Sequence, residues 1–172
     1  PTWASSIGID ETEEIYSVDP TEDGGFIAVG KFDGLNMQVG SYTLSTKGWT
    51  DGMIIKYTKE GEVEWATSVG EKSLDSLKSI ATTEDGGFIV VGSFESRNIT
   101  VGDYTLSNKG RADGMIIKYK PATSGKGYEV EWATSIGGVN DDYIKATATT
   151  SDGGFIVAGD FTHDDITVGD YT

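Results

Sequence analysis

Apolar and polar positions fall into short runs along the whole chain, and turn-forming residues separate these runs. Residues 77–82 predict a first strand, and residues 88–94 are almost continuously apolar. Such a continuous run predicts a strand buried on both faces. Glu84–Gly87 lies between the two runs, and its Asp-Gly and Gly-Gly pairs favour the positive φ of a tight hairpin turn. The pattern therefore predicts a β-hairpin over residues 77–94.

Two further strands follow this hairpin. Residues 99–106 predict a small β excursion, and residues 113–119 predict a third long strand. Residues 129–136 alternate with period two, which predicts a fourth strand with the even-numbered residues on one face. The expected even-numbered face consists of Val130, Trp132, Thr134 and Ile136. Glutamates on the other side predict a solvent-facing outermost strand, because charges discourage edge-to-edge pairing.

The same elements recur along the chain. Two motifs, Trp-Ala-[Ser/Thr]-Ser-[Ile/Val]-Gly and Asp-Gly-Gly-Phe-Ile, each occur three times, and both shift by 62 and then by 67 residues. Their copies begin at Trp3, Trp65 and Trp132, and at Asp23, Asp85 and Asp152. Self-similarity at this period indicates a repeat architecture.

Four strands per repeat, joined in hairpins and most apolar in the middle, are typical of a β-propeller blade. The period exceeds the roughly 40–50 residues of common blade repeats, and the 99–106 excursion accounts for the excess. We predict an all-β chain of blades with four antiparallel strands, containing about two and two-thirds repeats of 62–67 residues. Residues 1–172 form a single repeat domain in this interpretation, divided into residues 3–64, 65–131 and an incomplete 132–172.

The motifs above, together with Asp-Gly-Met-Ile-Ile-Lys-Tyr at Asp51 and Asp113, resemble the bacterial β-propeller repeats of secreted and cell-surface proteins. The resemblance covers essentially the whole chain. It implies an extracellular or cell-surface location and a role as a scaffold or binding module. It implies no activity, because those proteins mostly carry the repeats without catalysis.

The third copy contains only the first two predicted strands, and propellers usually need about 4–8 blades to close. We therefore expect the chain to be part of a larger propeller or assembly. The favoured interpretation is a fragment of a longer protein. The alternative is a homo-oligomer in which exposed blade faces and strand edges associate.

Composition excludes several classes of partner. The chain has 28 Asp and Glu against 13 Lys and Arg, a net charge of −15. Such a charge repels phosphate backbones and anionic lipid headgroups, so we expect neither nucleic-acid nor simple electrostatic membrane binding. No cysteine is present, which excludes disulfides and thiolate metal sites. No apolar stretch approaches the ~20 residues of a membrane span, so we expect no membrane insertion.

Acidic residues recur at fixed positions of the repeat. Glu13, Asp75 and Asp142 each lie ten residues before an Asp-Gly-Gly turn, and Asp51 and Asp113 precede the third strand. Glu13, Asp75 and Asp142 are candidate Ca²⁺ ligands, because this ion takes several carboxylate oxygens. The structural alternative is that they accept backbone N–H bonds at turns. Recurrence favours the structural role, so no cofactor is expected.

Residues that break the repeat are better candidates for ligand contacts. Trp49 lies in a loop where the next copy has Arg111. An unrepeated aromatic residue in a loop suits stacking on a sugar, and contact between chains is the rival role. Tyr42, Tyr104 and Tyr171 in the β excursions are further candidates, provided that these hairpins are exposed.

The sequence indicates no catalytic constellation. His163 is the only histidine, and no Ser-His-Asp arrangement is apparent. We therefore predict a non-catalytic scaffold or interaction module that binds a protein or carbohydrate through its variable loops. These loops comprise residues 31–38, 93–98, 120–128 and 160–165.

Two alternatives remain open for the function. The first is a propeller enzyme that acts on polysaccharide at a central channel. It requires unrepeated carboxylates on the innermost strands, where Tyr16, Lys78 and Lys145 occupy equivalent positions instead. The second is a blade fragment that assembles with other copies into a multi-chain ring.

Overall fold

The computed structural model describes residue 4 and residues 6–8 and 11–162. These residues form fourteen strands joined by turns and loops, with no helix among them. The all-β prediction is therefore confirmed for this part of the chain. Trp3, His163 and Tyr171, which the sequence singles out, lie outside the described residues.

Two four-stranded antiparallel sheets carry most of the fold, and in each sheet the strand order follows the chain order. The first sheet contains β1 (Glu13–Pro20), β2 (Phe26–Asp33), β5 (Thr50–Tyr57) and β6 (Val63–Val69). The second sheet contains β7 (Asp75–Thr82), β8 (Phe88–Phe94), β11 (Asp113–Pro121) and β12 (Tyr128–Ile136). The strands expected around 77–82, 88–94, 113–119 and 129–136 all exist, and the last forms an outer edge.

A short hairpin interrupts each of these sheets between its second and third strands. These hairpins are β3 (Met37–Val39) with β4 (Tyr42–Leu44), and β9 (Asn98–Val101) with β10 (Tyr104–Ser107). The second hairpin is the excursion expected over residues 99–106. A third sheet begins with β13 (Asp142–Thr149) and β14 (Phe155–Phe161).

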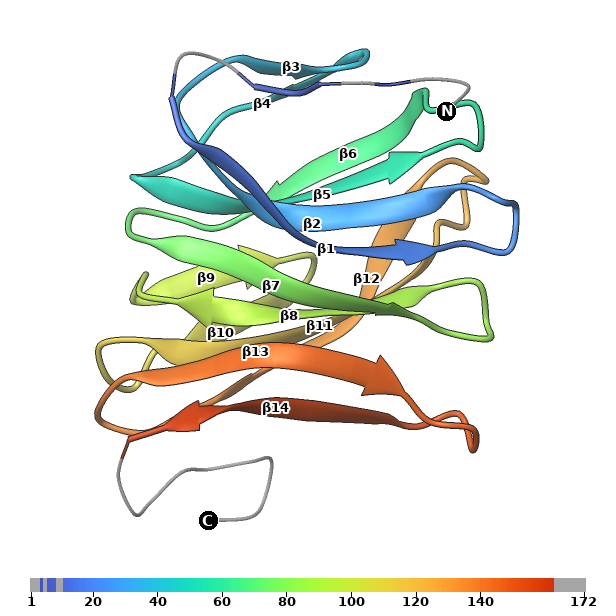
Figure 1. Ribbon diagram of the computed structural model, residues 1–172. Helices are drawn as coiled ribbons and strands as arrows, with labels where there is room; N and C mark the ends of the chain where they lie inside the picture. The colour runs from blue at the N-terminus through green and yellow to red at the C-terminus, as the bar shows by residue number, and fades with distance from the viewer. Residues whose placement is uncertain (1–3, 5, 9–10, 163–172) are drawn as a thin grey trace.

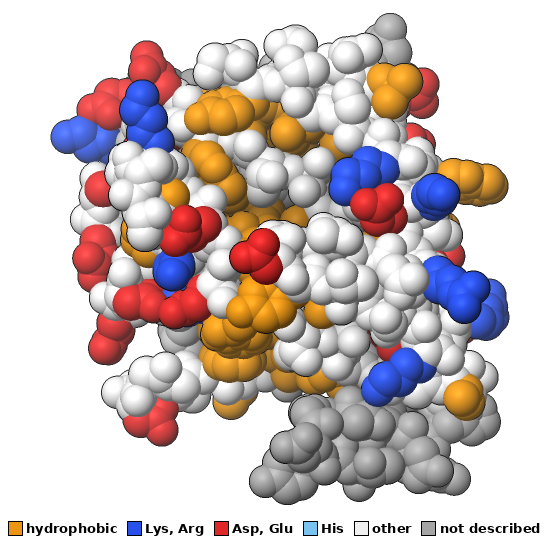
Figure 2. Space-filling view, turned by 180° about the vertical axis from the view of Figure 1, so that it is seen from behind, with side chains coloured by type: hydrophobic (Ala, Val, Ile, Leu, Met, Phe, Trp, Pro, Cys, Tyr) orange, Lys and Arg blue, Asp and Glu red, His pale blue; other side chains and the backbone are white. Residues whose placement is uncertain are grey.

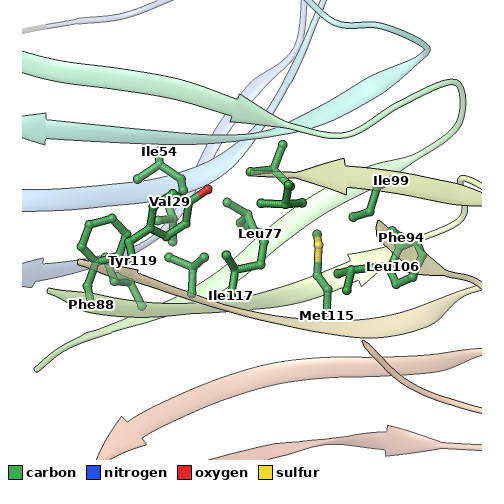
Figure 3. Packing of buried hydrophobic residues seen from close by; sticks show 14 of the residues in the cluster. Val29, Ile54, Leu77, Phe88, Phe94, Ile99, Leu106, Met115, Ile117 and Tyr119 are labelled. Atoms are coloured by element: carbon green, nitrogen blue, oxygen red, sulfur yellow. The ribbon is translucent and has the colours of Figure 1, made fainter. Parts of the chain in front are cut away.

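The three sheets stack face on face, and β1, β7 and β13 follow one another along the front of the stack (Figure 1). All of β8 is buried, as its continuous apolar run predicts. Val29 and Ile54 of the first sheet lie over Leu77 and Ile117 of the second in one apolar cluster (Figure 3). Burying apolar surface between sheets is therefore the main stabilising interaction of the stack.

The repeated tryptophan packs between consecutive sheets. The Trp65 ring on β6 meets Tyr119 and Tyr128 of the second sheet edge to face, with ring centroids 6.0 and 5.4 Å apart. Trp132 on β12 packs against Phe155 of the third sheet, with centroids 5.7 Å apart. The tryptophan therefore joins one repeat to the next.

A β-bulge in the outer strand corrects one sequence-based assignment. Lys118 pairs with Trp132 but Tyr119 pairs with Val130, which leaves Glu131 as an extra residue. Val130 therefore packs against the core between the first and second sheets, while Trp132 packs against the third sheet. The prediction that Val130 shares a face with Trp132 was wrong, because one extra residue reverses the alternation.

The first strand of each sheet carries a bulge as well. Tyr16 on β1, Lys78 on β7 and Lys145 on β13 are each the extra residue of a bulge. A glycine stands at each of these bulges on the neighbouring strand. At Gly92 an added Cβ would lie only 2.0 Å from the Ser76 carbonyl oxygen, so only glycine permits this close approach.

The Asp-Gly-Gly turns form as the sequence predicts. Gly86 has a φ of 77°, and the Asp85 carboxylate accepts a hydrogen bond from the Gly87 N–H at 2.9 Å. The same carboxylate lies 2.8 Å from the ammonium of Lys118, a nearly buried residue of β11. The turn is therefore fixed to the third strand of its own sheet by an ion pair.

Candidate functional site

The candidate site lies at the end of the stack where β2, β6, β8 and β12 end and where β5, β7, β11 and β13 begin (Figure 1, left). Four buried aspartates fix the loops at this end: Asp51, Asp75, Asp113 and Asp142. Each stands at or next to the start of a strand. Their carboxylates accept hydrogen bonds from loop backbone N–H groups, and these bonds attach the loops to the sheets.

Asp75 illustrates how this attachment works. Its Oδ2 accepts hydrogen bonds from the Glu71 N–H at 2.7 Å and from the Ser96 hydroxyl at 2.7 Å. Its Oδ1 accepts from the N–H groups of Glu95 and Ser96 at 3.1 and 3.2 Å. One carboxylate thus holds two loops that are about twenty residues apart in sequence. This is the turn-stabilising role that the recurrence of the aspartate favours.

Asp51 and Asp113 are less completely satisfied. Oδ2 of each accepts one backbone hydrogen bond, from Lys47 and from Lys109, while Oδ1 has no hydrogen-bond partner among the described residues. Burial, with a smaller contribution from the neighbouring carboxylate of Asp75, raises the pKa of Asp51 to about 6. The pKa of Asp113 is raised by burial in the same way. These two carboxyl groups are therefore easier to protonate than ordinary aspartates.

A polar cleft of about 450 Å³ opens between the fixed loops. Its lining consists of Glu71, Lys72, Ser73, Glu95, Ser96, Arg97 and Asn98. Two acidic and two basic side chains balance each other there, and hydroxyl and amide groups supply both donors and acceptors. The volume and the balanced charge suit a small polar ligand with several hydroxyl groups.

Trp49 does not itself line this cleft, but it lies on an adjoining loop and is 74% exposed. The residues on both sides of it contact the cleft loop: the Thr50 N–H donates to the Ser73 carbonyl at 3.3 Å, and Gly48 packs against the Lys72 backbone. The Lys47 ammonium also binds the Glu71 carboxylate at 2.9 Å. An exposed aromatic ring is therefore held on a loop that is itself bound to the lining of the cleft.

Basic residues concentrate at this end of an acidic protein. Lys47, Lys72, Arg97, Lys109 and Arg111 all lie in these loops, and the two arginines are the only ones in the chain. In the view from behind, blue side chains gather along the right edge and red ones are more frequent on the left (Figure 2). The loop end is thus less acidic than the rest of the surface.

The other ligand-binding candidates lie apart from Trp49. Arg111 is in the equivalent loop one sheet further along, where it is exposed and 3.4 Å from the Asp141 carboxylate. Tyr42 and Tyr104 lie on the two short hairpins, and their hydroxyls donate to the backbone carbonyls of Glu64 and Glu131 at 2.7 and 2.8 Å. Both acceptors are the extra residues of outer-strand bulges. The two tyrosines therefore fix the hairpins to the sheets.

The candidate metal ligands are not gathered in one place. Glu13, Asp75 and Asp142 lie at the start of β1, β7 and β13, one in each sheet. Asp142, like Asp75, accepts backbone bonds, from Gly138 at 2.7 Å and from Thr162 at 3.1 Å. Among the residues that the structure describes, no group of three or more histidine, aspartate or glutamate side chains is arranged to hold a metal ion.

Sequence reasoning did not find the cleft itself. The sequence does mark residues 93–98 as a variable loop, and this loop contains Glu95, Ser96 and Arg97 of the cleft lining. Nothing comparable marks Glu71–Ser73, whose place beside residue 95 depends on how the sheets stack. The hydrogen bond from the Glu95 N–H to the Leu74 carbonyl, at 3.0 Å, joins the two loops.

Neither a protein-family model nor a curated protein sequence matches this chain. In the part of the chain that the structure describes, there is no helix of the length and apolar character that crossing a membrane requires. The fold and the loop-end cleft are therefore the basis for a functional proposal.

Proposed function

We propose that this chain is a non-catalytic binding module that holds a carbohydrate in the cleft beside Trp49. The observation that carries the proposal is the exposed Trp49 ring on a loop bound to a polar cleft. Aromatic rings stack on the apolar face of a sugar, and hydroxyl, amide and charged groups bind its hydroxyls. A loop whose backbone is already held loses little conformational entropy when a ligand binds beside it.

The architecture supports a scaffold role. In each four-stranded sheet the strand order follows the chain order, as it does in a propeller blade. We infer that the sheets are blades of a β-propeller, and that the chain belongs to an extracellular or surface protein of bacterial type. The sequence resemblance to secreted bacterial repeats agrees with this inference. Loops held on a rigid frame are common positions for recognition.

A glycan array followed by titration tests the carbohydrate proposal. The wild-type protein should bind at least one glycan, and Trp49→Ala should weaken that binding by about tenfold or more, as loss of a stacking ring does. Leu35→Ala is the matched control, because Leu35 is also an exposed apolar residue in a loop at this end. Equal binding by Trp49→Ala and wild type would reject the site, and a folded protein that binds no glycan would reject the carbohydrate function. Release of reducing sugar from a bound glycan would reject the non-catalytic part.

Self-assembly is a second candidate function, and β14 is the observation that favours it. β2 and β8 each pair with strands on both sides, whereas β14 pairs only with β13 within the described residues. Ile156 on β14 is 62% exposed, and a shallow apolar hollow surrounds it. The hollow is lined by Ala146, Thr147, Ala148, Ile156, Val157 and Ala158. An open edge with an apolar face favours pairing with another chain.

Light scattering coupled to size exclusion, over a concentration series, tests this second function. Assembly predicts a discrete multiple of 18.3 kDa. Ile156→Lys should return it to the monomer, because a charge on the apolar face opposes pairing. A wild-type protein that stays monomeric at every concentration would reject assembly.

A further inference from the structure

Lys78 is the extra residue of the β7 bulge, and the bulge directs its side chain toward the neighbouring first sheet. Its ammonium lies 3.8 Å from the centre of the Tyr16 ring, which is the bulge residue of β1. β-bulges commonly re-aim a side chain near functional sites. The cation–π contact holds the Lys78 ammonium in a defined place.

Lys78 differs from Lys31 on β2 and Lys145 on β13 in its charge partners. The Lys31 ammonium lies 3.1 Å from the Glu14 carboxylate, and Lys145 forms an ion pair with Asp160. Within the described residues, no carboxylate lies within ion-pair distance of Lys78. Burial lowers the pKa of Lys78, as does the positive charge of Lys31, while the more distant Glu14 raises it. These three neighbouring side chains are two ammonium groups and one carboxylate, which leaves one positive charge in excess among them.

Lys78 lines a cleft of about 140 Å³. Its lining comprises Lys31, Thr50, Leu74, Asp75, Ser76, Lys78, Ser93 and Glu95. The cross-strand pair two residues before each bulge residue differs between the sheets. In the first sheet it is Glu14 with Lys31, and in the third it is Tyr143 with Asp160. In the second sheet the pair is Ser76 with Ser93. Two serines thus stand where the other sheets have larger side chains, and they leave room beside Lys78.

The lining of this cleft also contains two acidic residues, Asp75 and Glu95. Asp75 is buried, and both of its oxygens accept hydrogen bonds from the loops. Glu95 is exposed, and it also lines the larger cleft beside Trp49. On the far side of β7, Lys145 of β13 is neutralised by Asp160. Both carboxylates keep their charge, but the charged groups that shift the pKa of Lys78 are Lys31 and Glu14, so Asp75 and Glu95 are not close partners of its ammonium.

We propose that this cleft binds a ligand carboxylate, which pairs with the Lys78 ammonium and accepts hydrogen bonds from the Ser76 and Ser93 hydroxyls. The Lys78 ammonium has no carboxylate at ion-pair distance among the described residues and can pair with one ligand carboxylate, whereas a divalent phosphate would add more negative charge beside Asp75 and Glu95. Glu95 borders both clefts, but Ser76, Lys78 and Ser93 do not line the cleft beside Trp49, and the proposal does not depend on the carbohydrate proposal. Uronic acids and simple organic acids both carry the required group.

Titration of the ¹⁵N-labelled protein, at constant ionic strength, tests the proposal. Sodium glucuronate and sodium acetate are the probes, with glucose as the neutral control. We expect saturable shifts of the Ser76 and Ser93 amide signals with the carboxylates and none with glucose. A response to glucuronate alone would identify a uronic acid, and equal affinities would identify the carboxylate alone as the recognised group.

Lys78→Met should weaken carboxylate binding by about tenfold or more, as loss of a charge-assisted contact does. Lys145→Met is the matched control, since Lys145 is the same bulge residue in the third sheet but already has an acidic partner. It should bind like wild type, and Lys78→Arg should retain most of the affinity because it keeps the charge. Trp49→Ala should also bind the carboxylate normally, which separates this site from the cleft at Trp49. An absence of saturable shifts, or equal weakening by Lys78→Met and Lys145→Met, would overturn the proposal.

Discussion

The Asp51 carboxylate occupies the space in which a side chain on residue 70 would begin. A Cβ added to Gly70 would lie 2.5 Å from Asp51 Oδ1, and one added to Gly137 would lie 2.6 Å from Asp113 Oδ1. The glycine that ends each Trp-Ala-Thr-Ser-[Ile/Val]-Gly motif is thus required by the buried aspartate of the third strand. Two motifs that are distant in the repeat are coupled through this contact.

Gly70→Ala should therefore destabilise the protein by about 1–3 kcal/mol, the usual cost of overpacking a buried contact. Urea unfolding measures the effect. The double variant Gly70→Ala with Asp51→Ala should lose less than the sum of the single changes, because removing the carboxylate makes room for the methyl group. Strict additivity would show that the two residues do not interact.

The raised pKa of Asp51, about 6, predicts an unusual pH dependence. Because the folded-state pKa lies above the unfolded value near 4, protonation of Asp51 favours folding. Its contribution is fully present below about pH 4 and is lost as the pH rises through about 6. Asp51→Asn, which has no charge to bury, should be more stable than wild type at pH 8 by about 2–3 kcal/mol.

Urea unfolding at pH 4, 6 and 8 checks this prediction. The difference between the two proteins should shrink toward pH 4, where Asp51 of the wild type is protonated and neutral. Asp113→Asn should show the same trend in direction, because burial raises the pKa of Asp113 as well. A difference that is constant over this range would contradict the raised pKa.

Asp85 should show the opposite pH dependence. Burial opposes its ionisation, but hydrogen bonds from Lys118, Thr83 and Gly87 outweigh that effect and lower its pKa to about 2. It therefore stabilises the fold above about pH 4, and this contribution is lost as the pH falls toward 2. Asp85→Asn should cost about 1–2 kcal/mol at pH 7, because the nearly buried Lys118 ammonium loses its closest carboxylate.

Asp152→Asn provides the matched control for Asp85. Asp152 accepts the same hydrogen bonds, from the Thr150 hydroxyl and the Gly154 N–H, but it has no lysine partner among the described residues. Asparagine can keep the backbone bond in both turns, so Asp152→Asn should cost less. Similar losses of stability for the two variants in urea unfolding would show that the ion pair with Lys118 contributes nothing.

Most of the strand order could be predicted from the sequence, because the repeat gives the same signals more than once. The apolar run at 88–94 and the turn at Asp85 identify one hairpin, and the other repeats carry the same pattern. The unrepeated Trp49 was predicted as a loop residue for the same reason, since it departs from an otherwise regular pattern. Its exposure agrees with that prediction.

The bulges and the clefts could not be predicted in this way. One extra residue at Glu131 moves Val130 to the other face, although period-two alternation in the sequence continues through it. The cleft beside Trp49 needs Glu71 and Glu95 on neighbouring loops, and their proximity depends on the stacking of sheets. Local patterns carry little information on either, because both depend on pairing between distant segments.

The two hairpin tyrosines allow the ligand-binding and structural roles to be separated. Each hydroxyl donates to the backbone carbonyl of a bulge residue, Tyr42 to Glu64 and Tyr104 to Glu131. Tyr42→Phe and Tyr104→Phe keep the ring and remove only this hydrogen bond, so each should cost about 1 kcal/mol in urea unfolding. Glycan titration of the same variants should give wild-type affinity if the hydroxyls serve the hairpins alone. Weakened binding with unchanged stability would instead assign the tyrosine hydroxyls to the ligand, as the sequence suggested.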